Sequence, residues 1–302
     1  MTCYHPLKAY RSQARNPETG RRGIVFRAAE ALDQYAILRV PCGRCTGCMI
    51  DRAQSIAIRC LHEAQMHSEN SFITLTYSNQ HLPTDYSVKL KDFQDFMKRL
   101  RKSLEPKLIR FFACGEYGET TLRPHYHALI FNHQFSNLKP HRKNKHNDQL
   151  YISEELSKLW PQGFHEIGHL TYKSAGYCAR YCLKKVVGDK ADDHYMRLSP
   201  IDNNWYRVAP EFAVGSRRPG LGSTWFDKYH TDAFPSDFVI VDGRKKKPPR
   251  YYLEKLKEVE KEKIQSARKR HGFTHKADNT PERRRVREIV QDEKIKRRKR
   301  EL

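Results

Sequence analysis

Two histidines separated by one residue, His125 and His127, lie in an apolar segment rich in strand-forming residues. Because side chains two residues apart share one face of a β-strand, the two imidazoles are expected to converge on one point. Glu116 precedes them and lies between Gly115 and Gly118, which favours a bend that carries the carboxylate toward the strand. Two imidazoles and a carboxylate, with coordination positions left open, are typical of a catalytic divalent-metal site.

A His-x-His pair taken alone is more often a structural or surface feature than a ligand set. A metal-binding strand of the cupin type is another alternative, but it requires a carboxylate shortly after the second histidine. This chain has Phe131 and Asn132 there. The residues that accompany the pair must therefore decide its interpretation.

Two tyrosines, Tyr177 and Tyr181, lie four residues apart in a segment that we expect to be helical, so their phenols are neighbours on one face. Lys184 follows one turn later. A phenol, with a pKa of about 10, is a poor nucleophile unless its anion is stabilised. A lysine ammonium and a metal-polarised phosphate would stabilise it. The alternative is that both tyrosines are core residues of an amphipathic helix.

A glycine-rich turn holds Cys42, Cys45 and Cys48 in a Cys-x-x-Cys-x-x-Cys pattern, which lets the thiolates wrap around one soft ion. Clustered cysteines in a reducing compartment more often bind metal than form disulfides. We therefore favour structural zinc, with an iron–sulfur cluster or metal-free thiols as alternatives. The fourth ligand must come from another part of the chain, and the candidates are Cys3, Cys60, His5 and His62.

The composition points to a nucleic-acid partner. The chain has 302 residues, of which 38% are hydrophobic and 30% charged, so it can form one or two domains with a real core. Its formal net charge is +22, which implies a polyanionic partner. The N-terminal residues lack the apolar core of a signal peptide, and no run reaches the roughly 20 apolar residues of a membrane span. We therefore expect a soluble intracellular protein.

The C-terminal part of the chain holds most of this charge. Residues 244–302 contain 23 Lys and Arg against 10 Asp and Glu, which is +13 of the +22. We expect a basic tail, helical in part and otherwise mobile, that binds DNA without reading its sequence. A tail that only adds solubility is the alternative.

The regions around the candidate residues alternate between strand and helix patterns. We expect helices at residues 50–67, 88–104 and 153–160, strands at residues 71–78, 108–114, 125–131 and 164–170, and a polar loop at residues 132–147.

Together, these motifs resemble the HUH superfamily of rolling-circle replication initiators, most closely the replication initiation proteins of Microviridae phages of the gokushovirus type. The resemblance runs from about residue 42 to residue 229. Residues 72–77 resemble the first motif of the family, residues 123–127 its His-hydrophobic-His motif, residues 177–185 its two-tyrosine motif, and residues 216–222 a downstream segment. Glu116 lies where related initiators carry an acidic metal ligand.

The resemblance implies a nickase mechanism. Glu116, His125 and His127 would hold one Mg²⁺ or Mn²⁺ that polarises the scissile phosphate. Tyr177 or Tyr181 would attack it, which gives a 5′-phosphotyrosine link and a free 3′-OH, and the second tyrosine would cut the regenerated origin. Expected helpers are Lys184 as catalytic cation and, as DNA contacts, Arg123, Lys185, Arg217 and Arg218, with Arg217, Arg218, Gly220 and Gly222 forming a close-approach turn suited to phosphate.

The expected partners are single-stranded DNA, the origin duplex, a host helicase and a host DNA polymerase, in the cytoplasm of a bacterial host. No membrane partner is expected. A non-catalytic single-stranded DNA binding or packaging protein is the alternative function. A conjugative relaxase or transposase is disfavoured because the chain has no helicase motif.

The resemblance also implies an α+β, ferredoxin-like catalytic domain, with a central antiparallel sheet and helices on one side of it. We expect a Cys-rich N-terminal element and helix at residues 1–68, the nicking domain at 69–190, its extension at 191–242 and the basic tail at 243–302.

Overall fold

The computed structural model describes residues 3–144, 146–181, 186 and 190–300. The contacts divide the chain into two compact units. The smaller unit comprises Met1–Arg52 and Gln265–Leu302, and the larger unit comprises Ala53–Ile264. The boundaries expected at residues 68, 190 and 242 stay a prediction.

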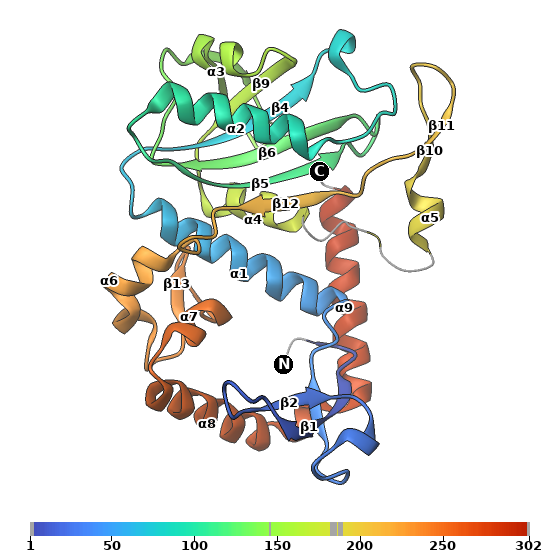
Figure 1. Ribbon diagram of the computed structural model, residues 1–302, viewed down its shortest axis with the longest axis vertical. Helices are drawn as coiled ribbons and strands as arrows, with labels where there is room; N and C mark the ends of the chain where they lie inside the picture. The colour runs from blue at the N-terminus through green and yellow to red at the C-terminus, as the bar shows by residue number, and fades with distance from the viewer. Residues whose placement is uncertain (1–2, 145, 182–185, 187–189, 301–302) are drawn as a thin grey trace. The chain divides into compact units, whose positions relative to one another are not determined.

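A seven-stranded sheet forms the centre of the larger unit (Figure 1), and every adjacent pair of its strands is antiparallel. In spatial order the strands are β12 (Phe212–Gly215), β5 (Arg110–Tyr117), β6 (Pro124–Phe131), β4 (Asn70–Tyr77), β9 (Gly163–Gly168), β8 (Gln149–Ile152) and β7 (Lys139–Lys143). The sequence therefore predicts the α+β class and the large antiparallel sheet correctly.

One face of the sheet packs against α2 (Leu90–Leu104) and α3 (Glu154–Leu159). The apolar residues of α2 recur every three or four positions, which places them on one stripe that faces the sheet. This core contains Phe93, Phe96, Met97 and Leu100 of α2, Ile73 and Leu75 of β4, Tyr126, Ala128 and Ile130 of β6, and Leu156 and Trp160.

The opposite face packs against α4 (Tyr172–Tyr181) and against the part of α1 (Thr46–Ala64) that belongs to the larger unit. Short side chains line the inner sides of both helices and allow them to approach the sheet closely: Ala53, Ala57 and Cys60 of α1, and Ala175, Cys178 and Ala179 of α4. The expectation of helices on one side is therefore wrong. Leu129 and Phe131 of β6 alternate with the residues of the other core and need their own cover.

A third core follows the sheet in the sequence and includes part of the expected tail. It joins Trp225 and Phe226 to Tyr252, Leu253, Leu256 and Ile264. The elements of this region are α6 (Ser223–Ala233), β13 (Val239–Val241), β14 (Arg244–Lys246), α7 (Arg250–Lys255) and the start of α8 (Glu258–Thr274). Residues 250–264 are thus built into the larger unit, because their apolar side chains bury against α6.

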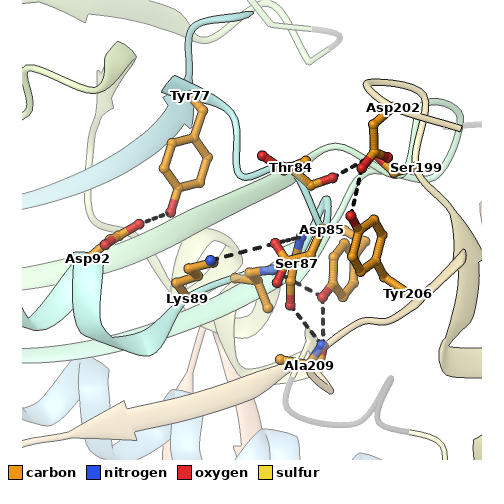
Figure 2. Close-up of polar contacts among 12 residues, drawn as sticks. Tyr77, Thr84, Asp85, Ser87, Lys89, Asp92, Ser199, Asp202, Tyr206 and Ala209 are labelled. Carbon is orange, nitrogen blue, oxygen red and sulfur yellow. Dashed lines mark hydrogen bonds and ion pairs between the residues drawn. The ribbon is translucent and has the colours of Figure 1, made fainter. Parts of the chain in front are cut away.

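A hairpin of β10 (Met196–Leu198) and β11 (Trp205–Arg207) follows α5 (Lys190–Tyr195). Figure 2 shows how this region is fastened to the loop before α2. The Ser199 hydroxyl donates to the carbonyl of Thr84 at 2.6 Å. The amide of Ala209 donates to the Ser87 hydroxyl at 2.8 Å. These bonds fix the entry of α2 and thereby the sheet beneath it.

The smaller unit contains a three-stranded sheet in the order β2 (Arg22–Val25), β1 (Leu7–Arg15), β3 (Leu38–Val40), together with the first turns of α1 and with α9 (Pro281–Arg300). Three short 3₁₀ helices, Ala28–Glu30, Asn79–His81 and Lys276–Asn279, complete the described elements. Within the described part of the chain, no helix has both the length and the apolar character needed to span a membrane.

Candidate functional site

Glu116, His125 and His127 meet on the α4 side of the sheet and form what we term the Glu-His-His cluster. Glu116 Oε1 lies 3.1 Å from His125 Nε2 and 2.9 Å from His127 Nε2. One ligand atom from each residue lies within 4.8 Å of the others. The Glu116 side chain is 1% exposed and that of His125 is 16% exposed. The predicted convergence of the two imidazoles with this carboxylate is therefore present in the fold.

The ladder between β5 and β6 positions the cluster. Glu116 pairs directly with His125, and Cys114 pairs with His127. Glu116 thus lies inside a strand, and the expected bend at this residue is wrong. Gly115 serves a different purpose, since a Cβ there would lie 2.6 Å from the Phe212 ring. A glycine is needed because the ring of the neighbouring strand covers this position.

Both imidazoles are held through Nδ1. His125 Nδ1 lies 3.0 Å from the carbonyl of Arg123 and must donate to it, because a carbonyl only accepts. His127 Nδ1 lies 2.9 Å from the Thr74 hydroxyl. These contacts leave Nε2 of each ring facing Glu116, as the outer partners of metal-binding histidines commonly do. Sequence reasoning missed Thr74, although its place two residues after Phe72 in a strand-forming segment put it on one face with that ring.

The residue between the histidines, Tyr126, points to the opposite face and is fully buried there. Its hydroxyl donates to the carbonyl of Lys89 at 2.8 Å and lies 2.5 Å from the hydroxyl of Tyr77. The Tyr77 hydroxyl in turn donates to Asp92 of α2 at 2.5 Å (Figure 2). Tyr126 therefore fastens the histidine strand to α2 and keeps the two imidazoles in register on the other face.

The donor set of the Glu-His-His cluster fits a divalent cation. With the proton of His125 on Nδ1, its Nε2 presents a lone pair to a carboxylate oxygen, and a shared cation lets both atoms act as ligands. Burial alone would raise the pKa of Glu116, but the hydrogen bonds and charges of His125 and His127 lower it below its ordinary value. The carboxyl group is therefore ionised, as a metal ligand must be.

Helix α4 carries Tyr177 to the cluster. The rings of Tyr177 and His127 are 5.0 Å apart and nearly perpendicular, at 87°. The Tyr177 ring also meets Phe72 edge-on at 6.4 Å, and Phe72 stacks on His127 at 5.8 Å. Tyr181 is the last residue of α4. Its side chain, as well as Lys184 and Lys185, falls outside the described residues, and their roles stay predictions.

The residues expected to contact DNA have different surroundings. The half-buried Arg123 donates to the carbonyl of Tyr77 at 2.6 Å, so its guanidinium fastens the start of β6 to β4. Arg217 and Arg218 are exposed in the turn after β12, the strand that pairs with β5. Their contact with DNA stays a prediction.

Gly222, in the same turn, has a different role from the expected phosphate contact. It adopts a φ of 76°, and a Cβ there would lie 2.3 Å from the Tyr252 hydroxyl. Its amide donates to Glu63 of α1 at 2.7 Å. The close approach at this glycine is therefore an approach to protein.

Of the candidates for a fourth cysteine partner, the fold selects Cys3. Its sulfur and those of Cys42, Cys45 and Cys48 all lie within 4.8 Å of one another, and we term these four residues the cysteine cluster. Cys60 is buried in the core of the larger unit. The two histidine candidates have other partners, since His5 pairs with Glu288 at 2.8 Å and His62 contacts the Tyr252 hydroxyl at 3.0 Å.

Comparison with known proteins gives consistent matches. A family of replication-associated proteins of the ORF2 type matches residues 70–186, the region that contains the Glu-His-His cluster and both tyrosines. The replication-associated protein VP4 of Bdellovibrio phage phiMH2K is 34% identical over 271 residues, which cover 87% of this chain and 79% of the relative. The replication-associated protein ORF2 of Spiroplasma virus 4 is 30% identical over 267 residues, with 83% and 79% covered.

A third relative, the replication-associated protein ORF4 of Chlamydia phage 1, is 29% identical over 228 residues, which cover 73% of this chain and 54% of the relative. No solved structure matches the chain.

Proposed function

The chain belongs to the family of phage replication-associated proteins, and we propose that it initiates rolling-circle replication by nicking and rejoining phage DNA at the origin. One observation carries this proposal: the Tyr177 ring lies against His127, within the Glu-His-His cluster. A phenol beside a site for a divalent cation is the arrangement that tyrosine attack on a phosphodiester requires.

The topology of the sheet supports a ferredoxin-like nicking domain. The strands and crossover helices follow one another as β4, α2, β5, β6, α3 and β9, with the hairpin β7–β8 inserted after β6. In space the fourth of the main strands, β9, lies beside the first, β4, followed by β6 and β5. This is the β-α-β-β-α-β arrangement of that class, and it places the Glu-His-His cluster on the three strands β4, β5 and β6.

In the proposed reaction, a divalent ion held by Glu116, His125 and His127 would polarise the scissile phosphate and offset its developing charge. The phenol oxygen of Tyr177 or Tyr181 attacks phosphorus and loses its proton. The bond from phosphorus to the 3′-oxygen breaks, and that oxygen leaves as a 3′-OH once it has gained a proton. The product is a 5′-phosphotyrosine.

The new linkage is itself a phosphodiester, so a 3′-OH can attack it and rejoin the strand without a nucleotide cofactor. In this scheme Thr74 and the carbonyl of Arg123 keep the two imidazoles oriented through Nδ1. Lys184 is assigned the role of a nearby cation for the phenolate. The second tyrosine allows a second cleavage while the first still holds DNA.

A denaturing gel tests the proposal. Purified full-length protein is mixed with labelled single strands that tile the phage genome, with Mn²⁺ or Mg²⁺. We expect a metal-dependent covalent protein–DNA band on the strand that carries the origin, lost in His127→Ala and in the double variant Tyr177→Phe, Tyr181→Phe. Tyr172→Phe, at the start of the same helix, is the matched control and should keep the band. If no strand gives an adduct, the nickase assignment is wrong, and a binding or packaging role is favoured.

A further inference from the structure

The cysteine cluster has the spacing of ligands around one ion. Cys3 Sγ and Cys45 Sγ lie 3.9 Å apart, far beyond the roughly 2.05 Å of a disulfide. Four sulfurs at about 2.3 Å from a tetrahedral ion are separated by about 3.8 Å along each edge. The measured distance therefore agrees with a mononuclear tetrahedral site.

Backbone amides are directed at the sulfurs of the cluster. The amide of Tyr4 donates to Cys45 Sγ at 3.3 Å, and the amide of Cys42 donates to Cys3 Sγ at 3.2 Å. The amide of Cys45 donates to Cys42 Sγ at 3.3 Å. Hydrogen bonds of this kind stabilise thiolates over thiols and orient ligands around a metal. The local backbone is thus folded around four sulfur acceptors.

The smaller unit lacks the hydrophobic core that would otherwise hold these thiols together. Among its described residues, burial is confined to Cys3, Ala9, Tyr10 and Gly47. Large apolar side chains lie outside, with Phe26 60% exposed and Tyr35 83% exposed. A module that buries so little apolar surface needs a covalent or metal crosslink to fold.

We propose that the cysteine cluster is a structural Zn²⁺ site with four thiolate ligands, which fastens the N-terminal segment to the start of α1 and holds the small sheet between them. An all-sulfur tetrahedral set selects zinc, and four protein ligands leave no open position for catalysis. A polynuclear iron–sulfur cluster binds its cysteines through different irons, which places their sulfurs farther apart than the 4.8 Å limit found here.

The site also explains the spacing of its ligands along the chain. Cys3 precedes β1, and Cys42 and Cys45 follow β3. Cys48 lies in the first turn of α1. The Cys3–Cys42 connection closes a loop over a separation of 39 residues, so one ion would remove much of the conformational freedom of the unfolded segment.

Metal analysis of the full-length protein tests this proposal. After dialysis against EDTA we expect one zinc per chain by mass spectrometry of the metals. Replacement of zinc by Co²⁺ should give the intense visible bands of tetrahedral cobalt with sulfur-to-cobalt charge transfer, at the intensity typical of four thiolates. Protein without tightly held metal, protein that holds iron in place of zinc, or a cobalt spectrum of mixed ligands would each overturn the proposal.

Three variants separate this site from the other residues. Cys3→Ser should release zinc to a chromogenic chelator at least tenfold faster. Cys60→Ala, which removes the rejected candidate, should retain zinc, and so should His127→Ala, which disables the Glu-His-His cluster. Zinc retained in Cys3→Ser, or lost in folded His127→Ala, contradicts the assignment whatever the nicking assay shows. If Cys3→Ser fails to fold, the cobalt spectrum of the wild-type protein decides.

Discussion

Glu116 and His125 face each other directly across the β5–β6 ladder, with Oε1 and Nε2 3.1 Å apart. Because neighbouring strands of one sheet supply both residues, their separation is set by backbone hydrogen bonds and not by loop conformation. A slip of one residue in this pairing would turn both histidines to the other face. The buried Tyr126, bonded to Lys89 on that other face, opposes the slip. The cluster is therefore rigid before any ligand binds.

Replacement of Glu116 by Gln removes the only carboxylate of the Glu-His-His cluster while keeping its shape. We expect the affinity for Mn²⁺, measured by calorimetry, to fall at least about tenfold, with a parallel loss of the covalent DNA adduct. Glu166→Gln is the control, since Glu166 lies on β9 and pairs with Arg142 at the surface. Equal Mn²⁺ affinity in Glu116→Gln and wild type would show that this carboxylate is not a ligand.

Thr74→Val tests whether the outer contact of His127 matters. Valine keeps the size and strand preference of threonine but cannot hydrogen-bond to His127 Nδ1, so we expect roughly tenfold weaker Mn²⁺ binding with the fold intact. Thr76→Val is the matched control on the same strand and the same face, opposite His125. The Nδ1 of His125 already bonds to the carbonyl of Arg123. If both variants bind Mn²⁺ alike, Thr74 has no positioning role.

The alternation of side chains in a strand was enough to predict that His125 and His127 share a face, because this rule depends only on local geometry. The position of Glu116 could not be predicted in the same way. Gly115 suggested a turn, but its cause is the Phe212 ring on a strand almost 100 residues later in the chain. A tertiary contact of this kind leaves no local pattern in the sequence.

The spacing of Cys42, Cys45 and Cys48 predicted a shared site, but the choice between Cys3 and Cys60 required the path of the chain around β1–β3. The extent of the basic tail was misjudged for a different reason. Its charge dominates the composition, whereas four apolar residues, Tyr252, Leu253, Leu256 and Ile264, decide the packing.

Gly222→Ala should strongly destabilise the larger unit. Gly222 combines a φ of 76° with a close approach to the Tyr252 hydroxyl, and we expect a loss of at least about 3 kcal/mol in the free energy of unfolding. Gly243→Ala is the control, because Gly243 has a φ of 70° with no atom within 4 Å of the added Cβ. Backbone strain alone should cost it about 1 kcal/mol. Equal losses in urea unfolding would rule out the steric contribution of Tyr252.

His62 should make the stability of the larger unit depend on pH. The ring stacks on Trp225 with centroids 3.6 Å apart, and its Nδ1 lies 3.0 Å from the Tyr252 hydroxyl. Burial lowers the pKa of His62 from 6.5 to about 4, because the charged imidazolium is poorly solvated there. Between these two values the unfolded chain binds the proton and the folded chain does not. The contribution to stability is therefore complete above pH 6.5 and is lost as the pH falls toward 4.

From pH 7.5 to pH 4.5 this single group should lower the free energy of unfolding by about 2 to 3 kcal/mol. Urea unfolding can be followed by tryptophan fluorescence, since Trp160, Trp205 and Trp225 all lie in the larger unit. His62→Phe retains a ring against Trp225 but cannot titrate, so we expect it to lose that part of the pH dependence. A variant with the full wild-type pH dependence would assign the acid sensitivity to other groups.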